Sequence, residues 1–310
     1  MKTRNSQLET YSYHNPVMLA ECLEGLNIKS DRIYVDLTFG GGGHSRAILE
    51  KLDKGRLIAF DQDEDSKAQA EKISERSFTF CQANFRYLKK YLKLQGVKKV
   101  NGILADLGVS SHQIDSAARG FSTRFDGPLD MRMNQQAGLT AAHVLNRYTE
   151  QDLHKIFGMY GEVRNAKTIA QAVVQHRTNK AFATTTDLKE ALKSFAPRGK
   201  EFKYFAQVFQ ALRIEVNEEM KALEEMLEQT AEVLEQGGRL VVLTYHSLED
   251  RMVKNFINKG KVFGEVEKDF YGNEIKPLKA INRKPIEASA EEIEKNKRAR
   301  SAKLRIAERI

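Results

Sequence analysis

The sequence predicts an α/β protein in which a parallel sheet is interrupted by an all-helical insertion. In the first third of the chain, short apolar runs alternate with helical patterns at the spacing of βαβ units. From residue 115 to residue 215 this alternation stops, and only helices and polar loops are indicated. We therefore expect one α/β domain, built from residues 1–114 and 216–310, into which residues 115–215 are inserted as a helical domain.

Each expected strand is a short apolar run bounded by Gly, Asp or Asn, which is typical of strands buried on both faces of a sheet. Four such runs lie before the insertion and one lies after it, at 32–37, 56–60, 78–81, 100–107 and 239–245. Helical patterns separate the first four runs, at 45–52, 65–74 and 85–94. This order predicts that the first four strands are parallel.

The insertion contains several helical patterns without a convincing strand. The expected helices are 139–146, 151–158, 164–177, 187–194 and 203–216. Thr185 or Asp187 would cap the fourth of these helices, with Glu190 completing a capping box. A long helix over 218–234 should follow and stop at the glycine pair 237–238.

Near the C-terminus, residues 261–287 predict an antiparallel hairpin at the sheet edge, with its turn near Tyr271–Asn273. The last residues, 295–310, hold seven basic side chains against Glu308 alone, a balance of +6 out of a net charge of +8. So concentrated a charge indicates contact with a polyanion. A solvated tail is the alternative.

Composition favours a soluble, cytoplasmic protein. Of the 310 residues, 41% are hydrophobic and 30% charged, which is enough for a sizeable core. No apolar run reaches the ~20 residues that span a bilayer, and Met1–Tyr13 lacks the apolar stretch of a signal peptide. Cys22 and Cys81 have no metal-ligand spacing, so we expect neither a disulfide framework nor a metal site.

A glycine-rich loop follows the first expected strand and precedes a helix. Gly40–Gly43 would let a ligand approach the backbone closely, because no Cβ intrudes. Dinucleotide-binding folds use such a loop for a pyrophosphate. This loop does not read G-x-G-x-x-G, however, and Asp36 ends the strand before it, which suits a ligand with an ammonium group better than a phosphate. A flexible turn is the alternative.

Three more polar motifs follow the second, third and fourth strands. Asp61 lies about 20 residues after the glycine loop, where a carboxylate can accept both hydroxyls of a ribose. The alternative for Asp61 is a helix N-cap, although Asp63 or Asp65 is better placed for that role. Phe85 lies on the expected adenine side, and residues 106–113 follow strand four. Four motifs at the carboxyl ends of strands predict a nucleoside-containing cofactor, either S-adenosylmethionine or NAD.

Basic side chains further along the chain have roles that spacing leaves open. His246 follows the fifth strand and is a candidate general base, although a lone histidine at a strand end is more often structural. Arg132, Arg213 and Arg251 could hold RNA phosphates or pair with acidic residues one or two positions away.

Several strings in the chain are long and unusual. They include GPLDMRM at 127–133, FQALRIEVN at 209–217 and HSLEDR at 246–251, and similar strings extend from His14 to Arg305. Together they resemble the bacterial 16S rRNA cytosine-N4 methyltransferase family, the MraW or RsmH proteins. One departure is 203–208, where the family usually has a His-Pro-Ala-Thr-Arg-like stretch. Here Gln or Val replaces the arginine, and Lys203 and Tyr204 would have to substitute through charge and stacking.

The resemblance implies a Rossmann-like class I methyltransferase fold with an inserted helical domain. It implies transfer of a methyl group from S-adenosylmethionine to N4 of a decoding-region cytosine in 16S rRNA, within assembled or nearly assembled 30S subunits. No membrane partner is implied, and a homodimer is left open. The cofactor-binding positions carried over by motif are Gly42, Gly43, His44, Asp61, Phe85, Asp106 and Gln113.

The chemistry suggests where an acceptor is needed. The exocyclic N4 of cytosine is a poor nucleophile, because its lone pair is delocalised into the ring, so the enzyme must align it with the methyl group. We expect 108–112 to form the floor of the base pocket, with Ser110 or Ser111 as hydrogen-bond partner and His246 as a second candidate acceptor. The basic tail and the insertion would contact RNA phosphates.

Three rival functions fit the sequence less well. The glycine loop argues against an NAD-dependent oxidoreductase, because it departs from the dinucleotide fingerprint. The complete set of cofactor-loop residues argues against a non-catalytic RNA-binding factor. The string DLGVSS after strand four differs from the Pro-Pro motif that is common in methyltransferases acting on DNA or protein amines.

Overall fold

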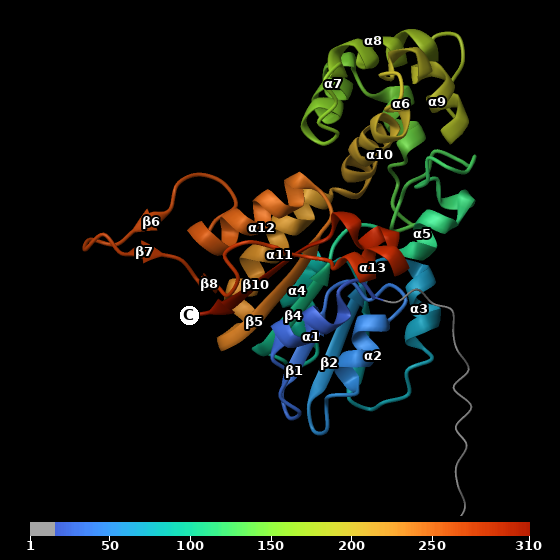
Figure 1. Cartoon of the computed structure of the whole chain (residues 1–310). Helices are drawn as coiled ribbons and strands as arrows, with labels where there is room; N and C mark the ends of the chain where they lie inside the picture. Colours follow the sequence, from blue (N-terminus) through green and yellow to red (C-terminus); the bar gives the residue numbers. More distant parts are fainter. Residues whose placement is uncertain (1–15) are drawn as a thin grey trace, which may run out of the picture.

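An eight-stranded sheet forms the centre of the protein, which a computed structural model describes for residues 16–310 (Figure 1). The prediction about Met1–Tyr13 lies outside the described residues. Strands β1 to β5 are parallel in the order β3-β2-β1-β4-β5, and β10 continues the sheet antiparallel to β5, β8 and β9. The strands are β1 Ile33–Asp36, β2 Arg56–Asp61, β3 Phe78–Gln82, β4 Val100–Asp106, β5 Leu234–Thr244, β8 Leu278–Ala280, β9 Ile286–Glu287 and β10 Lys303–Arg309.

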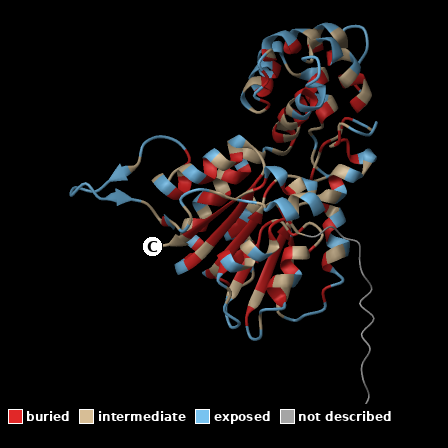
Figure 2. Cartoon of the chain, in the orientation of Figure 1, coloured by how far each residue is buried: buried red, intermediate tan, exposed pale blue. Residues whose placement is uncertain are grey.

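Helices cover both faces of this sheet, because successive strand residues are buried on opposite sides. Tyr34 and Leu57 pack in one core and Val35 and Ile58 in the other. The first core lies under α1 Leu19–Leu26, α2 Gly43–Leu49 and α3 Glu64–Ala70. The second lies under α4 Leu88–Leu94, α11 Glu219–Val233 and α12 Ser247–Lys259. Figure 2 shows the strands buried between the two helical layers. The predicted α/β class and strand runs are confirmed.

A separate group of helices stands beyond the carboxyl edge of the sheet (Figure 1). It contains α6 Ala141–Arg147, α7 Glu150–Met159, α8 Ala166–Arg177, α9 Thr185–Leu192 and α10 Glu201–Asn217. These helices share their own hydrophobic core, formed by residues between 129 and 216. We propose that this group is the inserted domain predicted over 115–215.

The cap of α9 differs from the prediction. The Thr184 side chain accepts a hydrogen bond from the Asp187 N–H at 3.2 Å, and the Asp187 carboxylate accepts one from the Thr184 N–H at 2.9 Å. The capping box therefore begins one residue before the predicted Thr185 and closes on Asp187 instead of Glu190.

Two predictions for the C-terminal third need correction. Helix α11 ends at Val233 and β5 begins at Leu234, so the glycine pair 237–238 lies inside a strand, where the pairing of β4 with β5 shifts register. The predicted hairpin turns where expected. Its strands, β6 Glu267–Lys268 and β7 Glu274–Ile275, form a separate exposed ribbon that projects from the body, and they do not join the sheet edge (Figure 1).

The basic tail is largely part of the fold. After α13 Ala290–Lys295 and the 3-10 helix Lys297–Ser301, β10 enters the sheet between β5 and β8. Arg305 is only 6% exposed and donates to the Asp250 carboxylate at 2.7 and 3.0 Å, while Arg309 donates to backbone carbonyls. The predicted phosphate contact is therefore wrong for these two residues. Exposed positions such as Lys297 and Arg300 keep it.

No helix of residues 16–310 combines the length and apolar character needed to cross a bilayer.

Candidate active site

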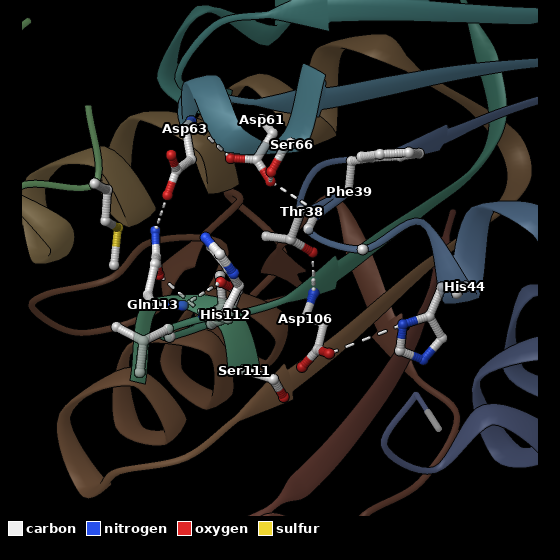
Figure 3. A pocket seen from close by; sticks show the side chains of 18 of the residues that line it. Thr38, Phe39, His44, Asp61, Asp63, Ser66, Asp106, Ser111, His112 and Gln113 are labelled. Carbon is white, nitrogen blue, oxygen red and sulfur yellow. Dashed lines mark hydrogen bonds and ion pairs between the residues drawn. The ribbon is translucent and has the colours of Figure 1, made fainter. Parts of the chain in front are cut away.

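The carboxyl ends of β1, β2 and β4 border a cavity of about 790 Å³ (Figure 3). It lies where the strand order reverses between β1 and β4, which is the usual ligand position in doubly wound sheets. All the predicted cofactor residues line it except Gly42, as do Ser110 and Ser111, whereas His246 does not. The motifs that the sequence places after four different strands thus meet at one cavity.

The glycine loop owes its shape to two close approaches. Gly42 has a φ of 79°, and a Cβ there would lie 2.7 Å from the Phe39 ring. Its N–H donates to the Phe39 carbonyl at 2.7 Å, so Gly42 shapes the loop and its N–H is not free for a ligand. Gly43 begins α2 and lines the cavity, and a Cβ there would lie 2.4 Å from Pro16 Cγ. The loop therefore presents backbone to the cavity at Gly43.

Asp61 is held by hydrogen bonds from its own surroundings. Its Oδ2 accepts from the Gly40 N–H at 2.7 Å and from the Ser66 hydroxyl at 2.9 Å, and its Oδ1 accepts from the Asp63 N–H at 2.8 Å. Burial raises the pKa of Asp61 to about 6. Because a carboxylate offers about four lone-pair sites, one acceptor site remains for a ligand. The N-cap of α3 is Asp63, which accepts from the Asp65 N–H.

Gln113 is part of a buried network behind the wall of the cavity. Its side-chain N–H donates to Asp63 Oδ2 at 2.6 Å, and its carbonyl accepts from the Ser110 N–H at 2.9 Å. The Ser110 hydroxyl accepts from the Gln113 N–H at 3.2 Å, which completes a capping box for α5 (Ser111–Asp115). Ser110 therefore caps a helix, while Ser111 lines the cavity half-buried. Sequence reasoning missed Arg119, whose guanidinium lies 2.9 Å from Asp63 Oδ2.

Asp106 and His44 lie at the other end of the cavity. His44 Nε2 is 3.1 Å from the Val17 carbonyl, and its Nδ1 is 3.8 Å from Asp106 Oδ2. The Tyr245 hydroxyl donates to Asp106 Oδ1 at 2.6 Å. Burial raises the pKa of Asp106 and of Tyr245. Tyr245 was missed because it looked like the last apolar residue of the fifth strand.

His246 has a structural position outside this cavity. It is the N-cap of α12, with Nδ1 accepting from the Glu249 N–H at 3.4 Å and Nε2 lying 3.1 Å from Glu249 Oε1. Among the described residues, Glu219, His246 and Glu249 could surround one metal ion. Arg213 already occupies the Glu219 carboxylate at 2.7 and 2.8 Å, and its positive charge opposes a second cation there.

The other arginines considered from the sequence are also paired. Arg132 donates to Asp130 at 2.6 Å, as the pairing alternative expected. Arg213 pairs with Glu219 instead of Glu215, and Arg251 lies 3.4 Å from Glu162 instead of pairing with its neighbour Asp250. These partners are distant in sequence or lie beyond the turn between helices, so spacing could not identify them.

Phe85 and Tyr204 have different environments. Phe85 begins the 3-10 helix Phe85–Tyr87 and lines the cavity on the β3 side, as expected for a residue beside an adenine. Tyr204 is only 5% exposed and packs in the core of the helical group. It is therefore unavailable for stacking on RNA, and Lys203, which is exposed, is the remaining substitute in 203–208.

Comparisons with known proteins agree with this arrangement. Ribosomal RNA small subunit methyltransferase H of Cytophaga hutchinsonii is 60% identical over 297 residues, covering 96% of this chain and 99% of that protein. The protein of the same name in Flavobacterium johnsoniae is 54% identical over 302 residues, covering 97% and 99%. A solved rRNA methylase from Streptococcus thermophilus aligns with a TM-score of 0.40 at 12% identity, over 94% of this chain and 93% of that one. Residues 11–310 match the model of the MraW methylase family, and the chain belongs to that family.

Proposed function

We propose that this protein methylates N4 of a decoding-region cytosine, cytosine 1402, in 16S rRNA of the 30S subunit. Membership of a methylase family gives the reaction class, methyl transfer to rRNA, and the cofactor, S-adenosylmethionine. The choice of N4, the 30S particle as partner and the cytoplasm as location are the finer parts of the proposal. Its main support is the single cavity at which four strand-end motifs converge.

The cavity suits a cationic nucleoside cofactor and a base together. At about 790 Å³ it is near the upper end of the ~300–1,000 Å³ typical of small-molecule sites. Its wall includes the carboxyl groups of Asp61 and Asp106, which complement positive charge, and one face of Gly43 that a ligand can approach closely. No described Lys, Arg or His of the wall other than His44 lies within 4 Å of the Asp106 carboxylate.

The proposed cofactor contacts follow from these positions. Gly43 and His44 would meet the amino-acid end, Asp61 would accept from the ribose hydroxyls through its remaining lone pair, and Phe85 would pack beside the adenine. Gln113 holds this wall in place through Asp63. The bound cofactor supplies an electrophilic methyl group. The work of the chain is to align an amino nitrogen with it.

The base side of the site is formed by the loop after β4. A cytosine within folded rRNA must leave its stack to reach this depth, as it does for other enzymes that modify bases. We propose Ser111 as a hydrogen-bond partner of the extruded base, because it lines the cavity and takes no part in the cap of α5. Ser110 and His246 were the other candidates, and both have capping roles instead.

Mass spectrometry of 16S rRNA tests the proposal directly. We expect N4-methylcytidine to be absent at this position in cells that lack the protein and to return when the gene is restored. An unchanged methylation pattern would refute the function. Loss of a methyl group from another nucleotide would keep the reaction class and refute the choice of N4. Binding of NAD, but not S-adenosylmethionine, in a fluorescence titration would favour the oxidoreductase instead.

A further inference from the structure

Asp106 has one carboxylate oxygen that is fixed and one that is open. The Tyr245 hydroxyl donates to Oδ1 at 2.6 Å, whereas no described residue donates a hydrogen bond to Oδ2. The nearest basic atom to Oδ2 is His44 Nδ1, which at 3.8 Å is beyond hydrogen-bond distance (Figure 3). The Asp106 side chain is 23% exposed and lines the cavity, so an incoming group can reach it.

The other carboxylates of the cavity wall are occupied by neighbouring donors. Asp61 accepts three hydrogen bonds from its surroundings. Asp63 accepts from Gln113, and the Arg119 guanidinium lies against both Asp63 and Asp65. Among the described residues that line the cavity, Asp106 is therefore the carboxylate with an oxygen left over for a substrate.

We propose that Asp106 Oδ2 accepts a hydrogen bond from the attacking amino nitrogen and then takes its proton, with Tyr245 as the residue that positions the carboxylate. This inference rests on the proposed function and names the acceptor that the sequence assigned to Ser110, Ser111 or His246. In this step the nitrogen lone pair forms the bond to the methyl carbon, and the carbon–sulfur bond breaks with its electron pair left on sulfur. The N4 proton passes to Oδ2 and later to water.

The surroundings of Asp106 suit this role. Burial raises the pKa of its carboxyl group, which makes the carboxylate a better proton acceptor than an exposed aspartate. A serine hydroxyl in the same place could accept a hydrogen bond but could not hold the proton. The titratable groups that surround Asp106 come from α1, β1, α2, β5 and α12, and they are Cys22, Asp36, His44, Tyr245 and Glu249.

Asp106→Asn tests the proton-acceptor role, because the amide keeps the shape of the side chain and cannot take a proton. We expect kcat on 30S subunits at saturating S-adenosylmethionine to fall about 100-fold or more, the range for loss of a general base. Calorimetric Kd values for the cofactor, and binding of 30S subunits, should stay within about threefold of wild type, since each 1.4 kcal/mol is tenfold. A normal kcat would overturn the inference, as would a weaker cofactor Kd with kcat intact.

Tyr245→Phe gives a second test that keeps the carboxylate. Removing the hydroxyl takes away a hydrogen bond that lowers the pKa of Asp106, so that pKa should rise. Activity needs the carboxylate form, so it falls as pH drops, and this acid limb should move to higher pH in Tyr245→Phe. The limb should vanish in Asp106→Asn. An acid limb at the same pH in all three proteins would overturn the inference.

The two levels of the proposal fail in different ways. If the wild-type protein transfers a methyl group to a different atom of rRNA, the proposed function fails, and the Asp106 variants can still be compared on that reaction. If the wild-type protein forms N4-methylcytidine and Asp106→Asn does so equally fast, only the inference about Asp106 fails. Ser111→Ala, which leaves Asp106 in place, is the matched variant on the same wall.

Discussion

Arg119 is a buried cation that joins the wall of the cavity to the loop leading into the helical group. It is 6% exposed, and its guanidinium lies 2.9 Å from Asp63 Oδ2 and 2.5 Å from Asp65 Oδ2. It also donates to the backbone carbonyls of Arg132 at 2.9 Å and Met133 at 3.2 Å. Replacing Arg119 with methionine keeps much of the side-chain volume and removes all of these interactions.

The expected loss of stability comes mainly from the carboxylate left behind. The Asp63 side chain is 4% exposed, and removing one partner of a buried ion pair costs about 3–5 kcal/mol. Asp65 is 41% exposed, so its share is small. We therefore expect Arg119→Met to lower the free energy of unfolding by about 3–5 kcal/mol in urea denaturation.

Arg124→Met is the matched control. Arg124 is 59% exposed and lies 3.8 Å from Asp115, so its loss should cost less than about 1 kcal/mol. Adding Asp63→Asn to Arg119→Met should restore part of the lost stability, because it removes the unpaired charge. Equal midpoints for Arg119→Met and Arg124→Met would refute the reasoning that a buried charge is left without its partner.

Three other changes test separate parts of the site. Gly43→Ala places a Cβ 2.4 Å from Pro16 Cγ and should weaken binding of S-adenosylmethionine by about tenfold or more in calorimetry, a cost of ~1.4 kcal/mol; Gly138→Ala meets no atom within 4 Å and should bind as wild type does. Because the pKa of Asp61 is about 6 and the carboxylate is the form that accepts from the ribose hydroxyls, cofactor affinity should decline as pH falls through 6, and an affinity that is flat from pH 8 to pH 5 would contradict this interaction. Replacing Lys297 and Arg300 with alanine should reduce the slope of log affinity for 30S subunits against log salt by up to about 0.7–0.9 for each phosphate that is no longer neutralised, and an unchanged slope would remove the tail from the RNA interface.

The sequence was sufficient for those features that depend on local pattern. The alternation of buried faces in residues such as Tyr34 and Val35 follows from strand geometry, and the carboxyl ends of parallel strands must share an edge. The convergence of Gly43, Asp61 and Asp106 on one cavity was therefore predictable.

Features that depend on long-range partners were not predictable in this way. Arg119 meets Asp63 across 56 positions, and the Tyr245 hydroxyl meets Asp106 across 139 positions. No spacing rule connects such residues, because the fold alone brings them together. The strand β10 had a local signal, since Leu304 and Ile306 alternate with charged residues. The density of positive charge in that segment favoured the interpretation as a polyanion-binding tail.

The decisive measurement uses the purified protein, methyl-labelled S-adenosylmethionine and 30S subunits that lack the modification. It asks whether the cavity beyond β1 and β4 delivers a methyl group from this cofactor to a cytosine amino group. We predict that label enters 16S rRNA and that nucleoside digestion recovers it as N4-methylcytidine, with Gly138→Ala equal to wild type and Gly43→Ala much slower at limiting cofactor. Absence of label from the rRNA, or its recovery in a different nucleoside, would contradict the proposed reaction.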